Sequence, residues 1–370
     1  MVDLRTQYER IRPEVNAAIQ KVIDDTQFIG GSEVKNFSGE FANYLGVKQV
    51  ITCANGTDAL QIAMMALDLK PGDEVITASF TYVATAEVIA LLKLTPVLVE
   101  VDPSTFTIDP AAIEKAITPR TRAIVPVHLY GQCADMEKIM AIAGKNKLFV
   151  IEDVAQAIGA EYVFKDGRKM KAGTIGTVGC TSFFPSKNLG CFGDGGALYT
   201  NDELLAQKIR MIANHGQSKQ YIHDAIGVNS RLDNIQAAVL RIKLHHLDEY
   251  AQARNKAASF YDRVFSANKK ITIPARAASS THVFHQYTLK LNGVDRDALQ
   301  KHLEQKGIES KVYYPKPLHR QKAYLNSGIN DADFPVTNAL CDQVISLPMN
   351  TELDEQTLKY ISDSVLEFCR

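Results

Sequence analysis

The sequence has no long apolar run and no basic block, and both absences narrow the classes of function. No stretch of about 18 uncharged apolar residues occurs, and the N-terminal MVDLRTQYERIRPEV carries charges where a signal peptide needs an apolar core. We therefore expect neither a membrane span nor export, and a cytoplasmic location. The formal net charge of −1, with scattered positive residues, leaves no electrostatic footprint for nucleic acid or an anionic membrane.

The sequence also lacks a C-x-x-C pair, an internal repeat, and a G-x-G-x-x-G string after a strand. The missing glycine string counts against a simple nucleotide-binding module. The six cysteines are expected to be reduced and structural. Cys180 and Cys191 flank Lys187, so a catalytic thiol is one interpretation, but a buried cysteine more often serves as a small apolar filler.

Short apolar segments alternate with helical ones through the first part of the chain. The runs QVIT, EVIT, PVLVEV, RAIVPV and KLFVIED are continuously apolar, which is typical of strands buried in a parallel sheet. Amphipathic runs near 84–92, 110–117 and 134–143 suit the crossover helices between such strands. This pattern predicts an α/β fold with a mainly parallel sheet.

The pattern changes in the second part of the chain. From about residue 202 the helical runs are longer, and from about residue 271 the short strand-like pieces HQYTLKL and SKVYYP precede a final helix. We predict a large domain over residues 1–249, with residues 1–30 packing on it, and a smaller C-terminal α+β domain over residues 250–370. With 46% apolar residues the chain can bury a large core.

Lys187 stands in the string GTVGCTSFFPSKNLGCFGDGGALYT, after a strand-like run and before a glycine-rich turn. A lysine placed by a rigid element in a sheltered pocket loses hydration, its pKa falls, and its amine can form an imine with an aldehyde. Asp153, in the pair Glu152–Asp153 upstream, suits the ring nitrogen of pyridoxal phosphate. A surface lysine and an acidic strand end are the alternatives for either piece alone.

A third piece precedes these two in the chain. Gly56 and Thr57 stand in CANGTDAL, between the strand-like QVIT and a helical run. A glycine lets the backbone approach an anion, and the N-terminus of the following helix favours a phosphate, although an ordinary capped helix start fits the same letters. The loops after successive parallel strands gather at one sheet edge, so the anion loop, the acid and the lysine are expected to meet there.

The strings CANGTDALQIA, FTYVATAE, VHLYGQCADM, VIEDVAQAIGA, TSFFPSKNLGCFGDGGALYTND, NHGQ and VNSRLDNIQAAVL resemble the DegT/DnrJ/EryC1/StrS family of nucleotide-sugar aminotransferases. The family lies in the fold type I superfamily of pyridoxal-phosphate enzymes, so the resemblance implies a seven-stranded type of sheet plus a smaller domain. It also implies pyridoxal 5′-phosphate as cofactor, L-glutamate and a nucleotide-linked keto sugar as substrates, and a homodimer with shared active sites.

The resemblance implies a role for each matching residue. Lys187 is expected to bind the cofactor covalently and, once released, to move the substrate proton, while Asp153 pairs with the pyridine nitrogen. Gln156 is implied to hydrogen-bond the cofactor's 3′ oxygen, and Tyr82 to stack on its ring; a polar helix residue and a core aromatic are the alternatives. Three residues are implied to bind the phosphate: Gly56, Thr57 and Ser182.

Other matching residues are implied to act on the sugar or across a dimer interface. The asparagine matching Asn229 reaches the neighbouring subunit's phosphate, and the arginine matching Arg231 meets the carboxylate of uronic acid sugars, which the guanidinium fork suits; a surface ion pair is the alternative for Arg231. Tyr313 and Tyr314 match positions that line the substrate pocket, and Tyr313 replaces a histidine found in similar members. We leave His319 out, since a lone histidine is more often structural.

Within the family, ANGTDALQ, YGQCADM and TSFFPSKNLGC resemble most the members that act on UDP-2-acetamido-2-deoxy-3-oxo-glucuronic acid, whose 3-amino product enters surface polysaccharide (O-antigen). A 3- or 4-aminotransferase for another UDP- or dTDP-linked keto sugar is the alternative. A regulator that binds the cofactor without turnover is a second alternative, against which the presence of Lys187 argues. Sugar dehydratases of the same family carry histidine in place of that lysine.

Overall fold

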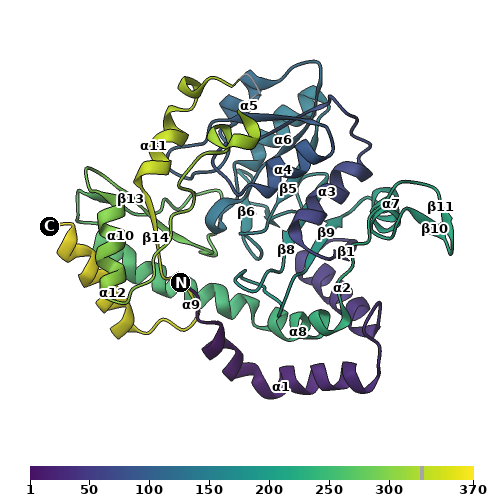
Figure 1. Ribbon diagram of the computed structural model, residues 1–370, viewed down its shortest axis with the longest axis horizontal. Helices are drawn as coiled ribbons and strands as arrows, with labels where there is room; N and C mark the ends of the chain where they lie inside the picture. Colours follow the sequence, from purple (N-terminus) through teal and green to yellow (C-terminus); the bar gives the residue numbers. More distant parts are fainter. Residues whose placement is uncertain (326–328) are drawn as a thin grey trace.

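The computed structural model describes residues 1–325 and 329–370 and is built around one seven-stranded sheet (Figure 1). The strand order is β1-β9-β8-β5-β4-β2-β3. β9 pairs antiparallel with both of its neighbours, and the other neighbouring pairs are parallel. The strands are β1 (Gln49–Cys53), β2 (Glu74–Ala78), β3 (Thr95–Val99), β4 (Thr121–Val125), β5 (Phe149–Asp153), β8 (Val178–Ser182) and β9 (Gly196–Thr200). The prediction of a mainly parallel α/β sheet is confirmed.

Helices cover both faces of this sheet, because its strands are apolar on both sides. On one face α3 (Gly56–Ala66), α4 (Ala84–Leu91) and α7 (Glu203–Ala213) share one apolar cluster with the strands. On the other face α2 (Ser32–Leu45), α5 (Pro110–Ala116), α6 (Met136–Asn146) and α8 (Asn234–His245) share a second cluster. The predicted helices near 84–92, 110–117 and 134–143 are thereby confirmed as α4, α5 and α6.

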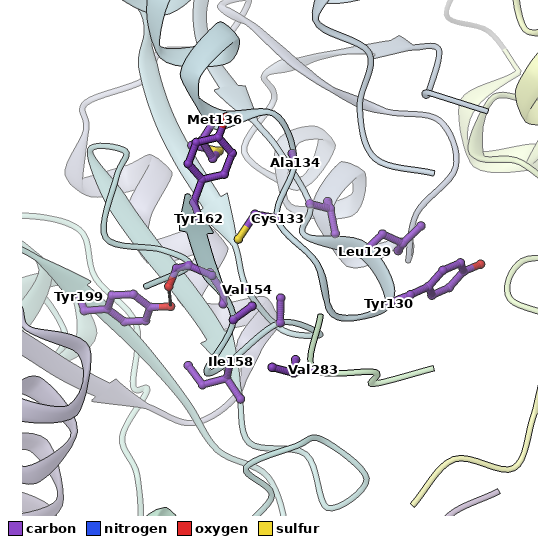
Figure 2. Close-up of a cluster of buried hydrophobic side chains, with 14 of the residues drawn as sticks. Leu129, Tyr130, Cys133, Ala134, Met136, Val154, Ile158, Tyr162, Tyr199 and Val283 are labelled. Atoms are coloured by element: carbon purple, nitrogen blue, oxygen red, sulfur yellow. Dashed lines mark hydrogen bonds between the residues drawn. The ribbon is translucent and has the colours of Figure 1, made fainter. Parts of the chain in front are cut away.

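The second cluster extends behind the end of β5, as Figure 2 shows. Val154 and Ile158 follow that strand and lie beside Val283 from a distant segment, within the cluster that also includes Tyr130. This apolar backing fixes the carboxyl end of β5, where the polar residues of the sheet edge begin.

The C-terminal region has its own small antiparallel sheet, in the order β12-β13-β14. Its elements are β12 (Ile271–Thr272), β13 (Tyr287–Leu291), β14 (Val344–Leu347), α9 (Leu247–Phe265), α10 (Arg296–Gln305), α11 (Pro335–Gln343) and α12 (Glu355–Phe368). Apolar side chains of α9, α10, α12 and this sheet form a separate cluster. The boundary expected at residues 249 and 250 falls inside α9, and the division into two domains stays a prediction.

The remaining elements lie at the periphery. α1 (Leu4–Asp24) packs on α8 below the sheet, and the hairpin β10 (Gln217–Lys219) and β11 (Ile222–His223) projects from the body beside α7 (Figure 1). A short hairpin and four 3₁₀ turns complete the described elements: β6 (Glu161–Val163), β7 (Lys169–Lys171), η1 (Leu129–Gly131), η2 (Leu318–Arg320), η3 (Lys322–Tyr324) and η4 (Asp331–Asp333).

The strand expected at SKVYYP is wrong. Only Lys311 pairs there, in a single-residue bridge with Ser346. The two tyrosines that follow turn toward the large sheet, where Tyr130 donates a hydrogen bond to the carbonyl oxygen of Tyr313, and Pro315 has no N–H to continue a ladder. Contacts with a distant part of the chain outweigh the β propensity of the segment.

Candidate active site

Lys187 lies in a tight loop that follows β8. The Lys187 amide donates to the carbonyl oxygen of Phe184 at 2.8 Å, which closes a turn within the loop. Gly190 ends the loop so close to Pro185 that a Cβ atom built on it would lie 2.4 Å from the Pro185 carbonyl oxygen. Only glycine fits there, and the loop therefore holds Lys187 at the carboxyl end of β8.

The electrostatic surroundings of Lys187 suit imine chemistry. Although the residue keeps part of its surface exposed, loss of hydration around its amine lowers the pKa of Lys187 to about 8, with the charge of Asp153 acting in the opposite direction. A lysine amine with such a pKa is partly unprotonated near neutral pH and can act as a nucleophile and as a base.

Asp153 ends β5 and is almost buried, with 7% of its surface exposed. One carboxylate oxygen accepts from the Thr85 hydroxyl at 2.9 Å, and the other accepts from the Ala155 amide at 3.1 Å. These two donors orient the carboxylate and leave it ready to face a cationic group. The sequence indicated Asp153 but not Thr85, which approaches from α4.

The preceding acid, Glu152, has a different part. It is fully buried on the opposite side of the strand, where its carboxylate accepts from the amides of Gly173 and Ile175, both at 2.8 Å. Because Ala134 donates its amide hydrogen to His128 Nδ1, the Nε2 of His128 carries the proton and donates to Glu152 at 2.9 Å. Glu152 thus secures the loop after β7, and only Asp153 of the acidic pair faces the site.

The expected anion loop forms the start of α3. Asn55 caps the helix by accepting from the Asp58 amide at 2.8 Å, and the first amides of a helix precede any intrahelical acceptor. A Cβ built on Gly56 would lie 2.6 Å from the Cβ of Ser182, so the glycine lets the helix start meet the end of β8. Amides of Gly56 and Thr57 beside a serine hydroxyl are a donor set suited to phosphate.

Ser230 holds this loop from a distant segment. Its hydroxyl donates to the Asp58 carboxylate at 2.6 Å and accepts from the Ala54 amide at 3.0 Å. Sequence reasoning missed Ser230, although it lies between the two indicated residues Asn229 and Arg231. The sequence around the loop indicated a capped helix start, with Asn55 as the cap and Asp58 three positions later, but it did not indicate the partner of Asp58.

Gln156 connects the large sheet to the C-terminal region. Its side-chain oxygen accepts from the Tyr130 amide at 2.9 Å, and its nitrogen donates to the Tyr314 hydroxyl at 3.0 Å. The second hydrogen of this nitrogen remains for a ligand. Burial raises the pKa of Tyr314, which therefore keeps its proton. Tyr313 lies beside it, with the two ring centroids 6.0 Å apart.

Tyr82 lies at the open side of the site. It is 58% exposed, and its ring centroid is 6.4 Å from that of Tyr314. Asn229 and Arg231 are also exposed, and their side chains make no hydrogen bond or ion pair with the described part of the chain. Because neighbours in an extended segment point to opposite sides, burial of Ser230 against the anion loop turns both side chains outward.

The other candidates have structural surroundings. Burial raises the pKa of Cys191 to about 11 and that of Cys180 well above its usual value, so neither thiol is activated as a nucleophile. His319 is buried between Ser79, at 2.7 Å, and Asp331, at 3.0 Å. Over the described residues no set of three or more histidine, cysteine, aspartate or glutamate side chains could hold a metal ion. Every helix in residues 1–325 and 329–370 is too short or too polar to span a membrane.

Comparisons with known proteins agree with this geometry. The model of the DegT/DnrJ/EryC1/StrS aminotransferase family matches residues 9–366. The chain is 48% identical to a UDP-2-acetamido-2-deoxy-3-oxo-D-glucuronate aminotransferase of Pseudomonas aeruginosa, over 97% of both proteins. It is 45% identical to a pleiotropic regulatory protein of Geobacillus stearothermophilus, over 100% of this chain and 98% of that protein.

Solved structures show the same fold. The crystal structure of Streptomyces venezuelae DesV in complex with a ketimine intermediate superposes with a TM-score of 0.95 at 41% identity, covering 100% of this chain and 98% of that one. NtdA of Bacillus subtilis, with bound cofactor PMP, gives a TM-score of 0.88 at 31% identity, covering 96% and 81%. The predicted fold type and cofactor are thereby confirmed, while the roles of individual residues stay predictions. The chain belongs to the DegT/DnrJ/EryC1/StrS family and is a nucleotide-sugar aminotransferase that uses pyridoxal 5′-phosphate.

Proposed function

We propose that the enzyme transfers the amino group of L-glutamate to the keto carbon of UDP-2-acetamido-2-deoxy-3-oxo-glucuronic acid, giving a 3-amino sugar. The observation that carries the chemistry is the meeting of Lys187, Asp153 and the Gly56 loop at one sheet edge. The exposed Arg231 and the similarity to the Pseudomonas enzyme support the choice of a uronic acid. A cytoplasmic location and a place in O-antigen synthesis belong to the same proposal.

The residues at this edge fit pyridoxal phosphate. The start of α3 with Ser182 offers donors for a phosphate, Asp153 offers a carboxylate for a ring nitrogen, and the Lys187 amine is available for an aldehyde. The cofactor, when bound, supplies the aldehyde that captures an amine and the ring that accepts electron density from the substrate carbon.

Lys187 serves both halves of the reaction. Its Nζ would hold the cofactor through its aldehyde, and once free it would take the proton from the amino-bearing carbon of glutamate and hold it for return in the same half-reaction. Glutamate gives up its amino group and leaves as 2-oxoglutarate. The second half-reaction runs the same steps backwards, with the keto sugar in place of 2-oxoglutarate, and the sugar receives the amino group. Removal of water from the amine, which lowers the pKa of Lys187 to about 8, keeps a useful fraction of it unprotonated.

Asp153 stabilises positive charge at the far end of the site, since its carboxylate is buried and held by Thr85. Gln156 offers its remaining N–H to the cofactor's 3′ oxygen, and the exposed Tyr82 covers the ring. Tyr313 and Tyr314 form the wall on the side of the C-terminal region.

A second subunit completes the site in this proposal. Asn229 and Arg231 extend outward from a segment that Ser230 fixes to the anion loop, so they are held in place while their side chains make no hydrogen bond or ion pair with residues 1–325 and 329–370. We infer that Asn229 meets the phosphate and Arg231 the sugar carboxylate in the neighbouring subunit of a homodimer. The planar fork of arginine suits a carboxylate because it donates two parallel hydrogen bonds.

A cofactor-binding regulator is the second candidate, favoured by the similarity to the pleiotropic regulatory protein of Geobacillus stearothermophilus. The lowered pKa of Lys187 and the oriented Asp153 favour turnover over mere binding. The purified protein, incubated with glutamate and a panel of UDP- and dTDP-linked 3-keto and 4-keto sugars, separates the candidates. We expect a 3-amino uronate by mass and NMR; an amino product from another sugar overturns the substrate, and cofactor binding without any product supports the regulator.

A further inference from the structure

Lys243 is a second lysine withdrawn from water near the active site. It lies on α8 with only 3% of its surface exposed, and its amine donates to the carbonyl oxygen of Gly190 at 2.7 Å. The same amine lies 5.5 Å from the ring centroid of Phe192, in a cation–π contact. Both partners belong to the segment that follows Lys187 in the chain.

This burial is costly for the folded state. No carboxylate within residues 1–325 and 329–370 pairs with Lys243, and burial lowers the pKa of Lys243 to about 8, with Cys191 acting in the opposite direction and the charge of Arg254 in the same direction as burial. A buried amine without an acid partner destabilises a protein compared with an apolar side chain of the same length. Stability alone therefore does not explain a lysine at this position.

The carbonyl that Lys243 holds is the end point of the Lys187 loop. Gly190 packs against the backbone of Pro185, with no room for a Cβ atom between them. The Lys187 amide donates a hydrogen bond to the carbonyl oxygen of Phe184. A shift of Gly190 is thus transmitted through the closed turn to Lys187. Gln236, on the same helix as Lys243, supports Phe192, two positions after Gly190, by accepting from the Phe192 amide at 2.8 Å.

We propose that Lys243 is a positioning residue that clamps the Gly190 carbonyl and so sets the place of the Lys187 amine before the cofactor arrives. The inference rests on the proposed role of Lys187. Its physical basis is that an error of about 1 Å in the place of a reacting group can slow a reaction by about a hundredfold. The hydrogen bond from Lys243 favours one position of the loop. The folded state loses some stability by burying the amine, and the enzyme gains a faster reaction.

Lys243→Met tests the clamp, since methionine is an unbranched apolar side chain that cannot donate a hydrogen bond to the Gly190 carbonyl oxygen. We expect the apoprotein of this variant to capture pyridoxal phosphate about tenfold more slowly than the parent, as measured by the absorbance of the bound cofactor. We also expect kcat to fall about tenfold, while the KM for glutamate stays within about twofold of the parental value. Trace acetylation of the apoprotein, read by peptide mass spectrometry, should show altered labelling of Lys187 relative to the other lysines.

Arg241→Met is the matched control, because Arg241 lies on the same helix and pairs with Glu33 and Glu40 of α2 instead of the loop. It should lower the thermal midpoint and leave capture, kcat and Lys187 labelling unchanged. Equal losses of capture and kcat in both variants would mean that Lys243 acts only through the stability of α8. Lys243→Met with capture and kcat within about twofold of the parent also overturns the clamp.

Two further variants separate the possible failures. Lys187→Ala must abolish covalent capture; if it does not, the proposed function fails at Lys187 whatever Lys243 does. Lys243→Gln keeps an N–H donor on a shorter side chain and should slow capture about threefold, less than methionine does. If the methionine variant does not fold, the glutamine variant decides: slowing of about threefold or more supports the clamp, and capture at the parental rate overturns it.

Discussion

The inner and outer parts of the candidate site differ in how their polar side chains are held. Asp153 and Gln156, on the inner side, have two hydrogen bonds each within the chain. Asn229 and Arg231, on the outer side, are exposed and make no side-chain hydrogen bond to the described residues. The difference teaches that the inner residues are preorganised within one chain, while the outer residues, which we propose to recognise the sugar, still have their side chains free for a second surface.

The largest effect is expected for Lys187→Ala on the inner side. Loss of the amine removes both the covalent attachment and the proton carrier, so turnover should fall by at least about a thousandfold with the fold intact. Steady-state rates with glutamate and the 3-keto sugar measure this, with circular dichroism for the fold. Lys169→Ala is the control, because Lys169 is an exposed residue of β7, and it should leave turnover unchanged. Turnover of the Lys187 variant within about tenfold of the parent contradicts the assignment.

Asp153→Asn should have the next largest effect. The shape is kept but the charge that we propose to face the ring nitrogen is removed, so we expect proton abstraction to slow by about a hundredfold or more while the cofactor stays bound. Stopped-flow absorbance of the glutamate half-reaction reports this step. Asp153→Glu should be milder, and Thr85→Val, which removes one orienting hydrogen bond, should cost about tenfold. Normal turnover by the asparagine variant would show that another acid pairs with the ring.

Arg231→Ala tests the outer side. An unpaired sugar carboxylate loses a charge-assisted contact of about 1.5 to 3 kcal/mol, so the KM for a uronate should rise about tenfold to a hundredfold. The glutamate half-reaction and a neutral hexose analogue should barely change. Equal losses with the uronate and the neutral sugar would show that Arg231 does not pair with the sugar carboxylate.

The same variant tests whether the site is shared. Mixed with Lys187→Ala protein under conditions where dimers exchange, it should yield some sites with both lesions and others with neither, if the two residues of one site come from different subunits as proposed. Partial recovery of uronate turnover is expected. A mixture no more active than its components would place Arg231 in the site of its own chain.

The smallest effect concerns stability and pH. The folded pKa of Lys243, about 8, lies below its ordinary value of 10.5, so between these pH values the unfolded chain binds a proton that the folded chain has released. Raising the pH through this window should therefore increase the free energy of unfolding of the parent relative to Lys243→Met, by up to about 3 kcal/mol.

Urea unfolding of the parent and of Lys243→Met at several pH values from 7 to 10.5 measures this difference. Buried thiols such as Cys53 and Cys180, whose pKa values are raised, lower the stability of both proteins with pH and cancel in the comparison. A constant difference across the range would show that Lys243 is as well solvated in the folded chain as in the unfolded one.

Sequence reasoning predicted the sheet, and it pointed to Gly56, Asp153 and Lys187, because the signals for both are local. Continuous apolar runs predicted five strands. Gly56 follows the run QVIT, Asp153 ends the run KLFVIED, and Lys187 follows the strand-like run that forms β8. Contacts between distant segments carry no local signal: Thr85 on Asp153 and Ser230 on the anion loop were missed. The strand expected around Tyr313 failed for the same reason, since its surroundings come from Tyr130.

The crowded glycines around the site have a consequence for directed evolution of the sugar preference. At Gly56 and Gly190 even an alanine meets Ser182 or the backbone of Pro185, so libraries that vary these two positions should yield few folded members. Gly39 in α2 and Gly144 in α6 face open space, and alanine there should raise stability by about 0.5 to 1 kcal/mol. A parent that carries these two alanines should tolerate more destabilising changes at Tyr313 and Tyr314, the proposed wall of the sugar pocket.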